Sequence, residues 1–375
     1  MTVDNLEKLT DGARAYLVPV GAVWGTLQGF ASGIPGLAFS AFRMIVREGA
    51  DVQLDHSVSA DSLTAALAPL PLAVRAQAEA QLDRLAAPRP PMALPGRDAP
   101  LGFSRPLVMG VLNVTPDSFS DGGKFLDMDA AIRRGRQMRA EGADIIDIGG
   151  ESTRPGATPV WEGEEAERVV PVIEALAAEG IPLSVDTRHS TVMTKAVEAG
   201  AHIINDVSAL TYDGDSMKAA VTTDAPIILM HSQGTPKTMQ DAPDYDDVLL
   251  DVYDYLENRI EACVAAGIDR NRLIVDPGIG FGKRVVQDNL ALMNGLAFFH
   301  NLGCPVLLGA SRKRFIGAIT GEEEAGKRMP GSLTAALKGV EQGMQIVRVH
   351  DVAETVQAVR LAQAMHDAAM MGSGA

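Results

Sequence analysis

Short apolar runs recur along the chain from residue 107 onwards, each four to six residues long and rich in Ile, Val and Leu. They show no clear alternation between apolar and polar positions, which is typical of parallel strands buried on both faces. The runs are Leu107–Leu112, Asp144–Ile148, Ile181–Val185, Ala201–Ile204, Ala225–Met230, Arg272–Val275, Pro305–Gly309 and Gln345–Val349. The sequence therefore predicts eight buried parallel strands.

Most segments between these runs have the length and pattern of crossover helices. Clear examples are Met128–Glu141, Gly163–Ala178, Tyr245–Ala266 and Asp351–Ala368. Eight β–α units in about 265 residues match a closed barrel better than an open doubly wound sheet. No glycine-rich dinucleotide fingerprint follows the first run, which further disfavours the open sheet. The predicted fold class is α/β, with a (β/α)8 TIM barrel over residues 106–371.

The residues before the barrel divide into two parts. Residues 86–105 contain five prolines, a density that interrupts helices and strands, and are expected to form a linker. Residues 1–85 are expected to form a small α+β N-terminal extension of unknown role. Within it, Ala13–Val18 and Phe42–Arg47 are candidate strands. Asp61–Leu85 reads as one or two amphipathic helices that break near Pro69 and Pro71.

Charge and composition narrow the range of partners. The net charge of −15 disfavours nucleic acid and anionic membranes as partners, so an anionic ligand needs a local positive site. The charge-free segment Ala15–Phe42 contains five glycines and two prolines, which argues against a membrane helix. Two cysteines, Cys263 and Cys304, have neither disulfide-framework nor metal-site spacing. A cytoplasmic protein without a membrane anchor is expected.

Polar residues stand at the end of every apolar run, where a TIM barrel carries its functional groups. Each one taken singly is more simply explained as a loop or capping residue, but eight on one rim indicate a site. In chain order they are Asn113, Glu151 with Thr153 and Arg154, Asp186, Asn205 with Asp206, His231, Asp276, Ser311 with Lys313, and Arg348 with His350.

These residues lie in stretches that resemble the dihydropteroate synthases. Residues 109–123 read Met-Gly-Val-Leu-Asn-Val-Thr-Pro-Asp-Ser-Phe-Ser-Asp-Gly-Gly, and residues 149–156 read Gly-Gly-Glu-Ser-Thr-Arg-Pro-Gly. The resemblance continues, in the family's order, through Ser184–Thr187, His202–Asp206, Asp276–Lys283, Ser311–Lys313 and Arg348–Asp351. It spans residues 107 to about 365 and leaves the first hundred residues outside.

The resemblance implies condensation of 6-hydroxymethyl-7,8-dihydropterin pyrophosphate with 4-aminobenzoate, which gives 7,8-dihydropteroate and pyrophosphate. A carboxylate suits the adjacent amino and N–H donors of the pterin ring, a role assigned to Asp276. Asp186, Asn205 and Thr153 complete the pterin site, and Lys313 and Arg348 supply cationic donors. A purely structural Asp276–Lys313 ion pair is the alternative for that couple.

The leaving pyrophosphate needs positive charge and metal. Arg348 and His350, at the end of the last run, are expected to contact it. Asn113 resembles the protein ligand of Mg2+, the expected cofactor, which keeps several waters and takes its other ligands from phosphate. A phosphate cradle made by Gly278, Gly280 and Gly282 is the rival use of that loop; close packing against the flat ring is the favoured one.

The implied mechanism is dissociative, and the catalytic residues are Asp121, Lys313, Arg348 and His350. Asp121 would lie near the cationic pterin; its alternative is a turn residue before Gly122 and Gly123. The attacking aromatic amine needs no strong base, and a structural role is favoured for His231 over that of a general base.

The aminobenzoate pocket is expected to include residues from two lid-like loops, Thr115–Lys124 and Glu151–Thr158, which exclude water. Its residues are Phe119, Thr153, Arg154, Pro155 and Arg314. Arg314 departs from the Ser that many family members carry after Ser-Arg-Lys, and Ser232 departs from the usual Met. The first departure leaves sensitivity to sulfonamides, the family's inhibitors, open.

Two other classes of protein share this scaffold. Pterin-binding barrels transfer a methyl group from methyltetrahydrofolate to a corrinoid protein, but they have no need for the anion-binding groups near Ser311 and Arg348. A non-catalytic pterin-binding paralogue is the third hypothesis. Release of pyrophosphate separates the synthase from both. The resemblance further implies a homodimer formed through barrel helices, with small-molecule substrates as the other partners.

Overall fold

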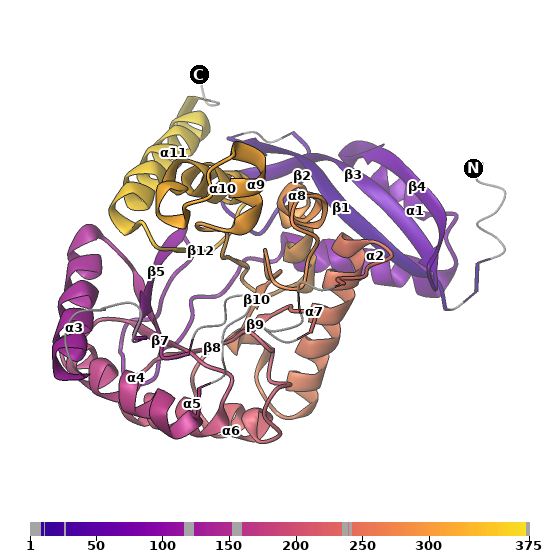
Figure 1. The fold of residues 1–375 in the computed structure, drawn as a ribbon. Coiled ribbons are helices and arrows are strands. Elements are labelled where there is room, and N and C mark those ends of the chain that lie inside the picture. The colour runs from indigo at the N-terminus through magenta and orange to yellow at the C-terminus, as the bar shows by residue number, and fades with distance from the viewer. Residues whose placement is uncertain are drawn as a thin grey trace.

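The protein is described by a computed structural model that covers residues 9–10, 12–25, 28–115, 124–151, 160–234, 239 and 242–372, with the backbone alone for 124–127 and 372. Eight parallel strands form a barrel, hydrogen-bonded in the order β10-β9-β8-β7-β6-β5-β12-β11 (Figure 1). A parallel bridge between Val275 and Val306 joins the two ends of this order and closes the barrel. The predicted TIM barrel is confirmed.

Each predicted apolar run overlaps a strand, and five of the strands extend one or two residues beyond the C-terminal end of their run. The strands are β5 (Leu107–Asn113), β6 (Ile145–Gly149), β7 (Leu183–Asp186), β8 (Ile203–Asp206), β9 (Ile227–Met230), β10 (Leu273–Asp276), β11 (Leu307–Leu308) and β12 (Ile346–Val349). Nearly all of their residues are buried, because helices cover the outside and side chains fill the inside. This explains why the sequence lacks an alternating pattern there.

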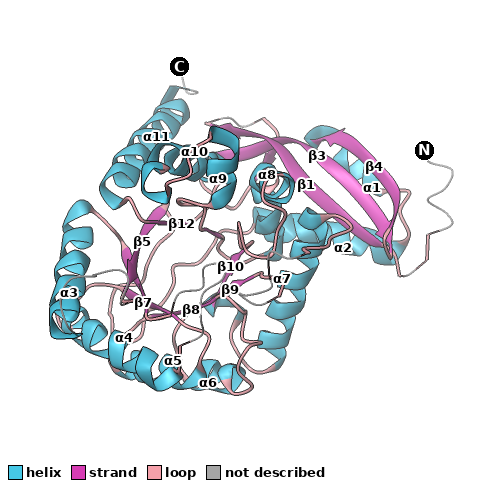
Figure 2. Ribbon diagram, viewed as in Figure 1, coloured by secondary structure: helices cyan, strands magenta, loops and turns pink. Residues whose placement is uncertain are grey.

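Helices form a ring around the strands (Figure 2). They are α3 (Lys124–Glu141), α4 (Glu162–Ala177), α5 (Ser190–Glu198), α6 (Ser216–Thr222), α7 (Val248–Ala265), α8 (Gln287–Asn294), α9 (Arg314–Thr320), α10 (Met329–Glu341) and α11 (Val352–Gly372), with the 3-10 helix η5 (Leu296–Leu302) after α8. Among the described residues, no helix combines the length and apolar character needed to cross a bilayer.

The barrel interior has two layers. The lower layer, at the start of the strands, is an apolar cluster made of Leu107, Met109, Ile145, Ile203, Ile228, Ile274, Leu307 and Ile346. Alternate residues of a strand point to the same face, so the residue two positions further on points inward one layer higher. In the upper layer lie Asp147, Asn205, Asp276 and Arg348, two positions beyond Ile145, Ile203, Ile274 and Ile346, and Asp186 joins them through its ion pair with Arg348. The polar residues of the rim are thus fixed by strand periodicity.

The stretch predicted to be a linker closes the lower end of the barrel. Met92 and Leu101 exchange two backbone hydrogen bonds, of 2.8 and 2.9 Å. This pairing turns Met92, Leu94, Leu101 and Phe103 into the apolar cluster of the lower layer. The prolines exclude extended pairing, but the apolar side chains between them still pack. The stretch is therefore a plug as well as a connection.

The N-terminal extension is an antiparallel sheet with helices on one face. The sheet contains β1 (Arg14–Trp24), β2 (Phe30–Ala31), β3 (Leu37–Glu48) and β4 (Asp51–Ser59), with β3 between β1 on one side and β2 and β4 on the other. The helices α1 (Leu63–Leu67) and α2 (Leu72–Ala86) pack over one face of it in a second apolar cluster. The two predicted strands and the helix break at the prolines are confirmed; β2 and β4 were not predicted.

The other face of the sheet packs on the barrel beside α7 (Figure 1). Tyr16 and Ile45 belong to the same buried cluster as the outer layer of the barrel. Arg47 makes ion pairs of 2.7 Å to Asp251 and 2.6 Å to Asp254, both on α7. Apolar burial and paired charges therefore both hold the extension against the barrel.

The far end of the extension contacts the last helix. The indole of Trp24 stacks on the imidazole of His366 in α11, with ring centroids 3.8 Å apart and planes at 5°. Its Nε1–H donates to the carbonyl oxygen of Glu341 at the end of α10, at 3.1 Å. The sheet thus spans the barrel wall from α7 to α11.

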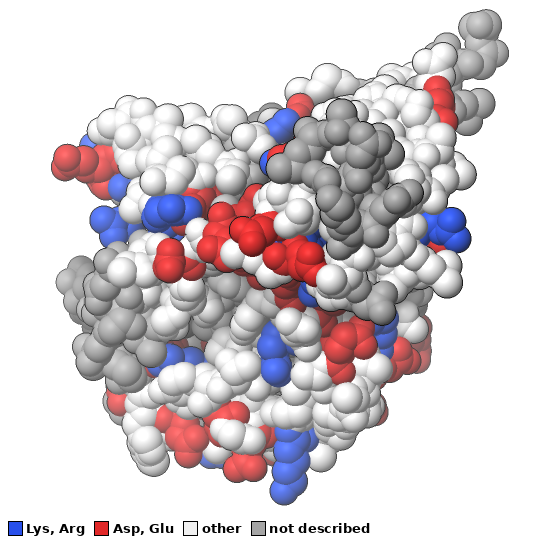
Figure 3. Space-filling model, turned by 90° about the vertical axis from the view of Figure 1, so that its right-hand side faces the viewer, with Lys and Arg blue, Asp and Glu red and all other residues white. Residues whose placement is uncertain are grey.

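Charge on the outer surface follows the composition. Figure 3 shows the side of the molecule that carries the extension, where acidic side chains gather in a band and basic ones are scattered. Asp and Glu outnumber Lys and Arg by 48 to 33. This face offers no continuous basic surface for a polyanion.

Candidate active site

Arg348 is the centre of an ion network in the upper layer. Its Nε donates to Asp147 Oδ2 and its Nη2 to Asp186 Oδ2, both at 2.6 Å. The amide of Asn205 also donates to Asp147 Oδ2, at 3.0 Å. Strands β6, β7, β8 and β12 each contribute one of these residues, and the network links them across the barrel. Of the residues predicted for the pterin site, it brings together Asp186, Asn205 and Arg348.

Two carboxylate oxygens in this network have no partner among the described residues. Oδ1 of Asp147 and Oδ1 of Asp186 are buried and accept no hydrogen bond from the described residues. Burial raises the pKa of Asp186 to about 7, against the opposing charge of Arg348. A buried acceptor without a donor is unfavourable, so these oxygens suit a ligand that brings N–H groups of its own.

Asp276, the last residue of β10, is held by its own loop. Its Oδ1 accepts the backbone N–H of Gly278 at 2.7 Å. Burial raises the pKa of Asp276, while that hydrogen bond and the charges of Lys313 and Arg348 oppose the rise. The predicted association of Asp276 with Lys313 is therefore present as a charge interaction.

The loop after β10 depends on its glycines. Gly278 and Gly282 have φ values of 68° and 58°, and a Cβ on either would lie 1.9 Å from His231 O or 2.4 Å from Gln233 O. The N–H of Gly278 is used by Asp276, and the N–H of Gly280 donates to Asn289 Oδ1 at 2.6 Å. Two of the three donors that a phosphate cradle needs are thus engaged, which favours the close-packing role of the loop.

A buried amine lies beneath this loop. Lys283 has no exposed surface, and its Nζ lies 2.8 Å from His231 Nδ1 and 3.2 Å from His231 O. Burial lowers the pKa of Lys283 and that of His231 well below their usual values. The pair connects the end of β9 to the loop after β10. The structural role expected for His231 agrees with these contacts.

The backbone turn at Arg312 sets the orientation of Lys313. Arg312 has a φ of 57°, a left-handed conformation that is unfavourable for a residue with a Cβ. Its N–H donates to Ser332 Oγ at 2.8 Å and its Nε to Asp351 Oδ2 at 3.1 Å, which hold the turn. Lys313 then places its Nζ 3.8 Å from the centre of the Phe281 ring, in a cation–π contact on the glycine loop.

The remaining predicted residues lie around this centre. Asn113 ends β5 and is partly buried, while His350 follows β12 and its Nδ1 lies 3.0 Å from Ser311 Oγ. Arg314 is exposed and begins α9. The other predicted residues lie outside the described part of the chain: Phe119, Asp121, Thr153, Arg154 and Pro155.

Three contributors were missed by sequence reasoning. Asp147 stands inside a buried strand, and a charged residue in an apolar run was a usable signal for a buried ion pair. Phe281 lies in the recognised Asp276–Lys283 stretch, but nothing in the pattern indicates its contact with Lys313. The left-handed turn at Arg312 has no sequence signal, because Gly, Asn or Asp would be expected there.

Comparisons with known proteins agree on one family. A family model described as pterin binding enzyme matches residues 109–350. The chain is 47% identical to the dihydropteroate synthase of Escherichia coli K12 over 274 residues, which cover 73% of this chain and 96% of that protein. It is 48% identical to the dihydropteroate synthase of Neisseria meningitidis serogroup B over 270 residues, 71% of this chain and 94% of that protein.

Solved structures give the same result. The dihydropteroate synthase of Yersinia pestis, in a complex with a sulfonamide drug, matches with a TM-score of 0.70 and 46% identity over 74% of this chain and 100% of that one. The enzyme of Xanthomonas albilineans with 7,8-dihydropteroate matches with a TM-score of 0.67 and 46% identity, over 74% and 98% of the two chains.

Proposed function

The chain belongs to the dihydropteroate synthase family of pterin-binding enzymes, and from this premise we propose how the mouth of its barrel carries out the family's reaction. The reaction is a transfer of a pterinylmethyl group in folate biosynthesis. It condenses 6-hydroxymethyl-7,8-dihydropterin pyrophosphate with 4-aminobenzoate, and the products are 7,8-dihydropteroate and pyrophosphate.

The pterin ring is assigned to the upper layer of the barrel. The observation that carries this assignment is that Oδ1 of Asp147 and Oδ1 of Asp186 are buried without a hydrogen-bond partner among the described residues. The 2-amino group and N3–H of a pterin are adjacent donors, and a carboxylate accepts such a pair in bidentate fashion. In this proposal Asp276 accepts them, Asp186 and Asn205 line the edge, and Thr153 adds a contact. Lys313 and Arg348 donate to the ring acceptors.

The pyrophosphate is assigned to the rim at β5 and β12. Arg348 and His350 supply charge and N–H donors there. Asn113 fits as the protein's Mg2+ ligand, because it is partly buried at the end of β5 and its amide oxygen is a neutral oxygen ligand of the kind Mg2+ takes. A bound Mg2+ would stabilise the negative charge of the leaving group. The Asn113→Ala variant tests this, since it should bind pterin normally and need more Mg2+ for the same rate.

The 4-aminobenzoate is assigned to the space beside Lys313 and Phe281. The cation–π contact places the Lys313 side chain against the Phe281 ring, and the aromatic ring of the substrate can pack beside them. Arg314, exposed at the start of α9, can reach the benzoate carboxylate. By resemblance, Phe119, Thr153, Arg154 and Pro155 complete the pocket.

The chemical step follows from these charges. The bond between the methylene carbon and the pyrophosphate oxygen breaks, and the electron pair leaves with the pyrophosphate. The carboxylates of Asp147, Asp186, Asp276 and Asp121 stabilise the cation that remains on the pterin. The nitrogen of 4-aminobenzoate then forms the new bond and releases one proton to water.

Two further assignments concern assembly and location. The described part of α11 exposes Leu361, Met365 and Met371, with 64%, 60% and 78% of their surfaces accessible, which supports a homodimer formed through this helix. Both cysteines, Cys263 and Cys304, are buried and unpaired, which supports a reducing, cytoplasmic location. Sedimentation of a Leu361→Asp variant as a monomer would support the first assignment.

The first experiment is release of pyrophosphate on mixing the protein with dihydropterin pyrophosphate, 4-aminobenzoate and Mg2+, with each omitted in turn. Release that requires both organic substrates is the expected result. Asp276→Ala should weaken pterin binding by about 2–4 kcal/mol in calorimetry, because a charged partner is lost. Tight pterin binding without release would instead identify a non-catalytic paralogue, and unchanged affinity in the variant would exclude Asp276.

A further inference from the structure

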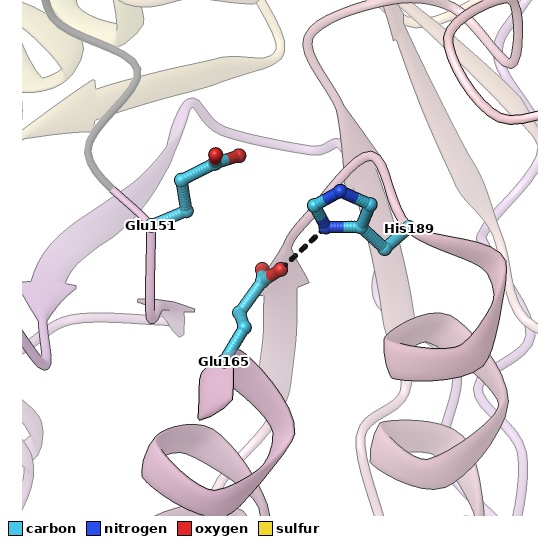
Figure 4. Close-up of side chains that lie close together, drawn as sticks. All are labelled: Glu151, Glu165 and His189. Atoms are coloured by element: carbon cyan, nitrogen blue, oxygen red, sulfur yellow. Dashed lines mark hydrogen bonds and ion pairs between the residues drawn. The ribbon is translucent and has the colours of Figure 1, made fainter. Parts of the chain in front are cut away.

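Four charged side chains form a compact group at the mouth of the barrel, outside the pterin network. Glu151 follows β6, Glu165 lies in the first turns of α4, and Arg188 and His189 connect β7 to α5. The carboxylates of Glu151 and Glu165 converge on the ring of His189, and the three lie within 4.8 Å of one another (Figure 4). This spacing is also that of a metal site, so the first question is what holds the charges together.

The group is already neutralised in pairs. Arg188 donates to both oxygens of Glu151, each at 2.9 Å, and His189 Nδ1 lies 2.7 Å from Glu165 Oε2. A metal ion would have to displace a guanidinium from one carboxylate and a proton from beside the other. With Arg188 and protonated His189 already in place, an added metal cation at this distance is unfavourable. The geometry therefore matches a pair of buried ion pairs better than a cation site.

The network joins the segments on either side of the β6–α4 connection. Glu151 Oε1 also accepts the N–H of Val160 at 3.1 Å, so one carboxylate contacts both ends of residues 152–159. Arg188 stacks on Tyr212, with 3.8 Å from its guanidinium carbon to the ring centre, which fixes the guanidinium from the far side. Glu165 has no exposed surface, and its Oε1 has no partner among the described residues. Loss of His189 would leave this buried carboxylate without its charged partner, which is unfavourable.

We propose that Glu151, Glu165, Arg188 and His189 are positioning residues that hold the two ends of the β6–α4 connection in register and thereby set the affinity for 4-aminobenzoate. The inference rests on the proposed function, since Thr153, Arg154 and Pro155 lie between those two ends. None of the four needs to touch substrate. They act through the backbone positions of residues 151 and 160.

The network predicts a pH dependence through His189. The hydrogen bond and the charge of Glu165 raise the pKa of His189 above its usual value. The contribution of the His189–Glu165 pair is therefore complete below the ordinary pKa of about 6.5 and is lost as the pH rises through the raised pKa. The charged and titratable groups that face the ring are Glu165, Glu151, Arg188, Tyr212 and Asp213.

The experiment measures the KM of both substrates and kcat between pH 6 and 9 from pyrophosphate release by the full-length protein. For the parent protein, the KM for 4-aminobenzoate should rise roughly tenfold as His189 loses its proton, the equivalent of about 1.4 kcal/mol. The KM for the pterin and kcat should change little. In His189→Gln this rise should be absent, and in Glu165→Gln it should shift to lower pH. Glu151→Gln should raise the KM at every pH.

Glu174→Gln is the matched control, because it makes the same change at an exposed position of the same helix, and it should behave as the parent. If the KM for 4-aminobenzoate depends on pH in the same way in His189→Gln and in the parent, the inference is overturned. A fall in kcat of His189→Gln at an unchanged KM would also overturn it. Stoichiometric Zn2+ or Mn2+ binding that His189→Gln abolishes would replace it with a metal site. Absence of pyrophosphate release from the parent protein would instead contradict the proposed function.

Discussion

The two layers of the barrel interior differ in almost every property although the same strands build both. On β6, Ile145 belongs to the lower layer and Asp147 to the upper one; on β10, Ile274 and Asp276 stand in the same relation. Two residues along a strand correspond to about 6–7 Å. Within that distance the interior changes from a closed apolar cluster to a group of buried charges. The contrast shows that one strand can serve stability and chemistry at different heights.

The energetics of the two layers differ in sign. Each buried aliphatic side chain of the lower layer contributes about 1.5–3 kcal/mol to folding. A buried ion loses several kcal/mol of hydration, which its partners only partly restore. The Oδ1 atoms of Asp147 and Asp186, which lack a partner in the described part of the chain, are part of this cost. The lower layer and its plug therefore stabilise a fold whose upper layer is arranged for a ligand.

The largest effect is expected where the upper layer loses its cation. Arg348→Met leaves Asp147 and Asp186 without their shared partner, which should cost about 3–5 kcal/mol of unfolding free energy and lower kcat/KM on the order of 10³-fold. Denaturant unfolding and pyrophosphate release measure the two. Adding Asp147→Asn and Asp186→Asn should restore much of the stability and none of the activity. Recovered activity in the triple variant would contradict the role of the charges.

The lower layer should respond in the opposite way. Met92→Ala or Leu94→Ala opens a cavity under the barrel and should lower the unfolding free energy by about 2–4 kcal/mol. The KM values and kcat should stay within twofold of the parent, since the plug is separated from the site by the whole lower layer. Leu72→Ala is the control, at a position that is 74% exposed. A plug variant that loses activity while still folded would mean the layers are coupled.

The pH dependence of stability should sharpen the comparison. Because burial raises the pKa of Asp186 to about 7, the folded state binds a proton more readily than the unfolded one. Its contribution is complete near pH 4 and falls as the pH rises towards 7. Asp186→Asn should reduce the loss of unfolding free energy between these two pH values by about 1–3 kcal/mol. An unchanged slope would assign it to other buried groups, for example Asp206 or Asp254.

The smallest of these effects concerns the buried amine below the glycine loop. Lys283→Met keeps the volume but removes the contacts to His231, so the loop that follows Asp276 should lose definition. We expect the KM for the pterin to rise about tenfold, the equivalent of about 1.4 kcal/mol, with kcat little changed. Kinetics at saturating 4-aminobenzoate measure this. Lys338→Met, at an exposed position on α10, is the control and should have no effect.

Features that depend on local pattern could be predicted from the sequence, whereas features that depend on long-range packing could not. The eight strands were predictable because their residues are buried on both faces, and the rim residues were predictable because they lie at or just after the C-terminal ends of those strands. The pairing of Arg348 with Asp147 was not, because 201 positions separate the two residues and only barrel closure brings them together. The plug was missed because prolines indicate an irregular backbone but say nothing about where Met92 and Leu94 pack.

The extension shows the same limit. Phe42–Arg47 was recognised as a strand because it is apolar and central in the sheet, whereas β4 is mostly exposed and polar, as an edge strand is. The face of the extension's sheet that packs on the barrel could not be assigned from sequence. Its residues Tyr16 and Arg47 bind partners on α7, which are more than 200 positions away. The 1–85, 86–105 and 106–371 division itself stays a prediction.

The stack of Trp24 on His366 gives the molecule a built-in optical reporter. The chain has two tryptophans, and the other, Trp161, is 72% exposed and lies at the start of α4 on the barrel. Replacing Trp161 with Phe would leave Trp24 as the single indole emitter, in ring contact with α11 only while the extension is docked. A change in its emission before the barrel unfolds would report release of the extension, and one shared transition would show that the two parts unfold as a unit.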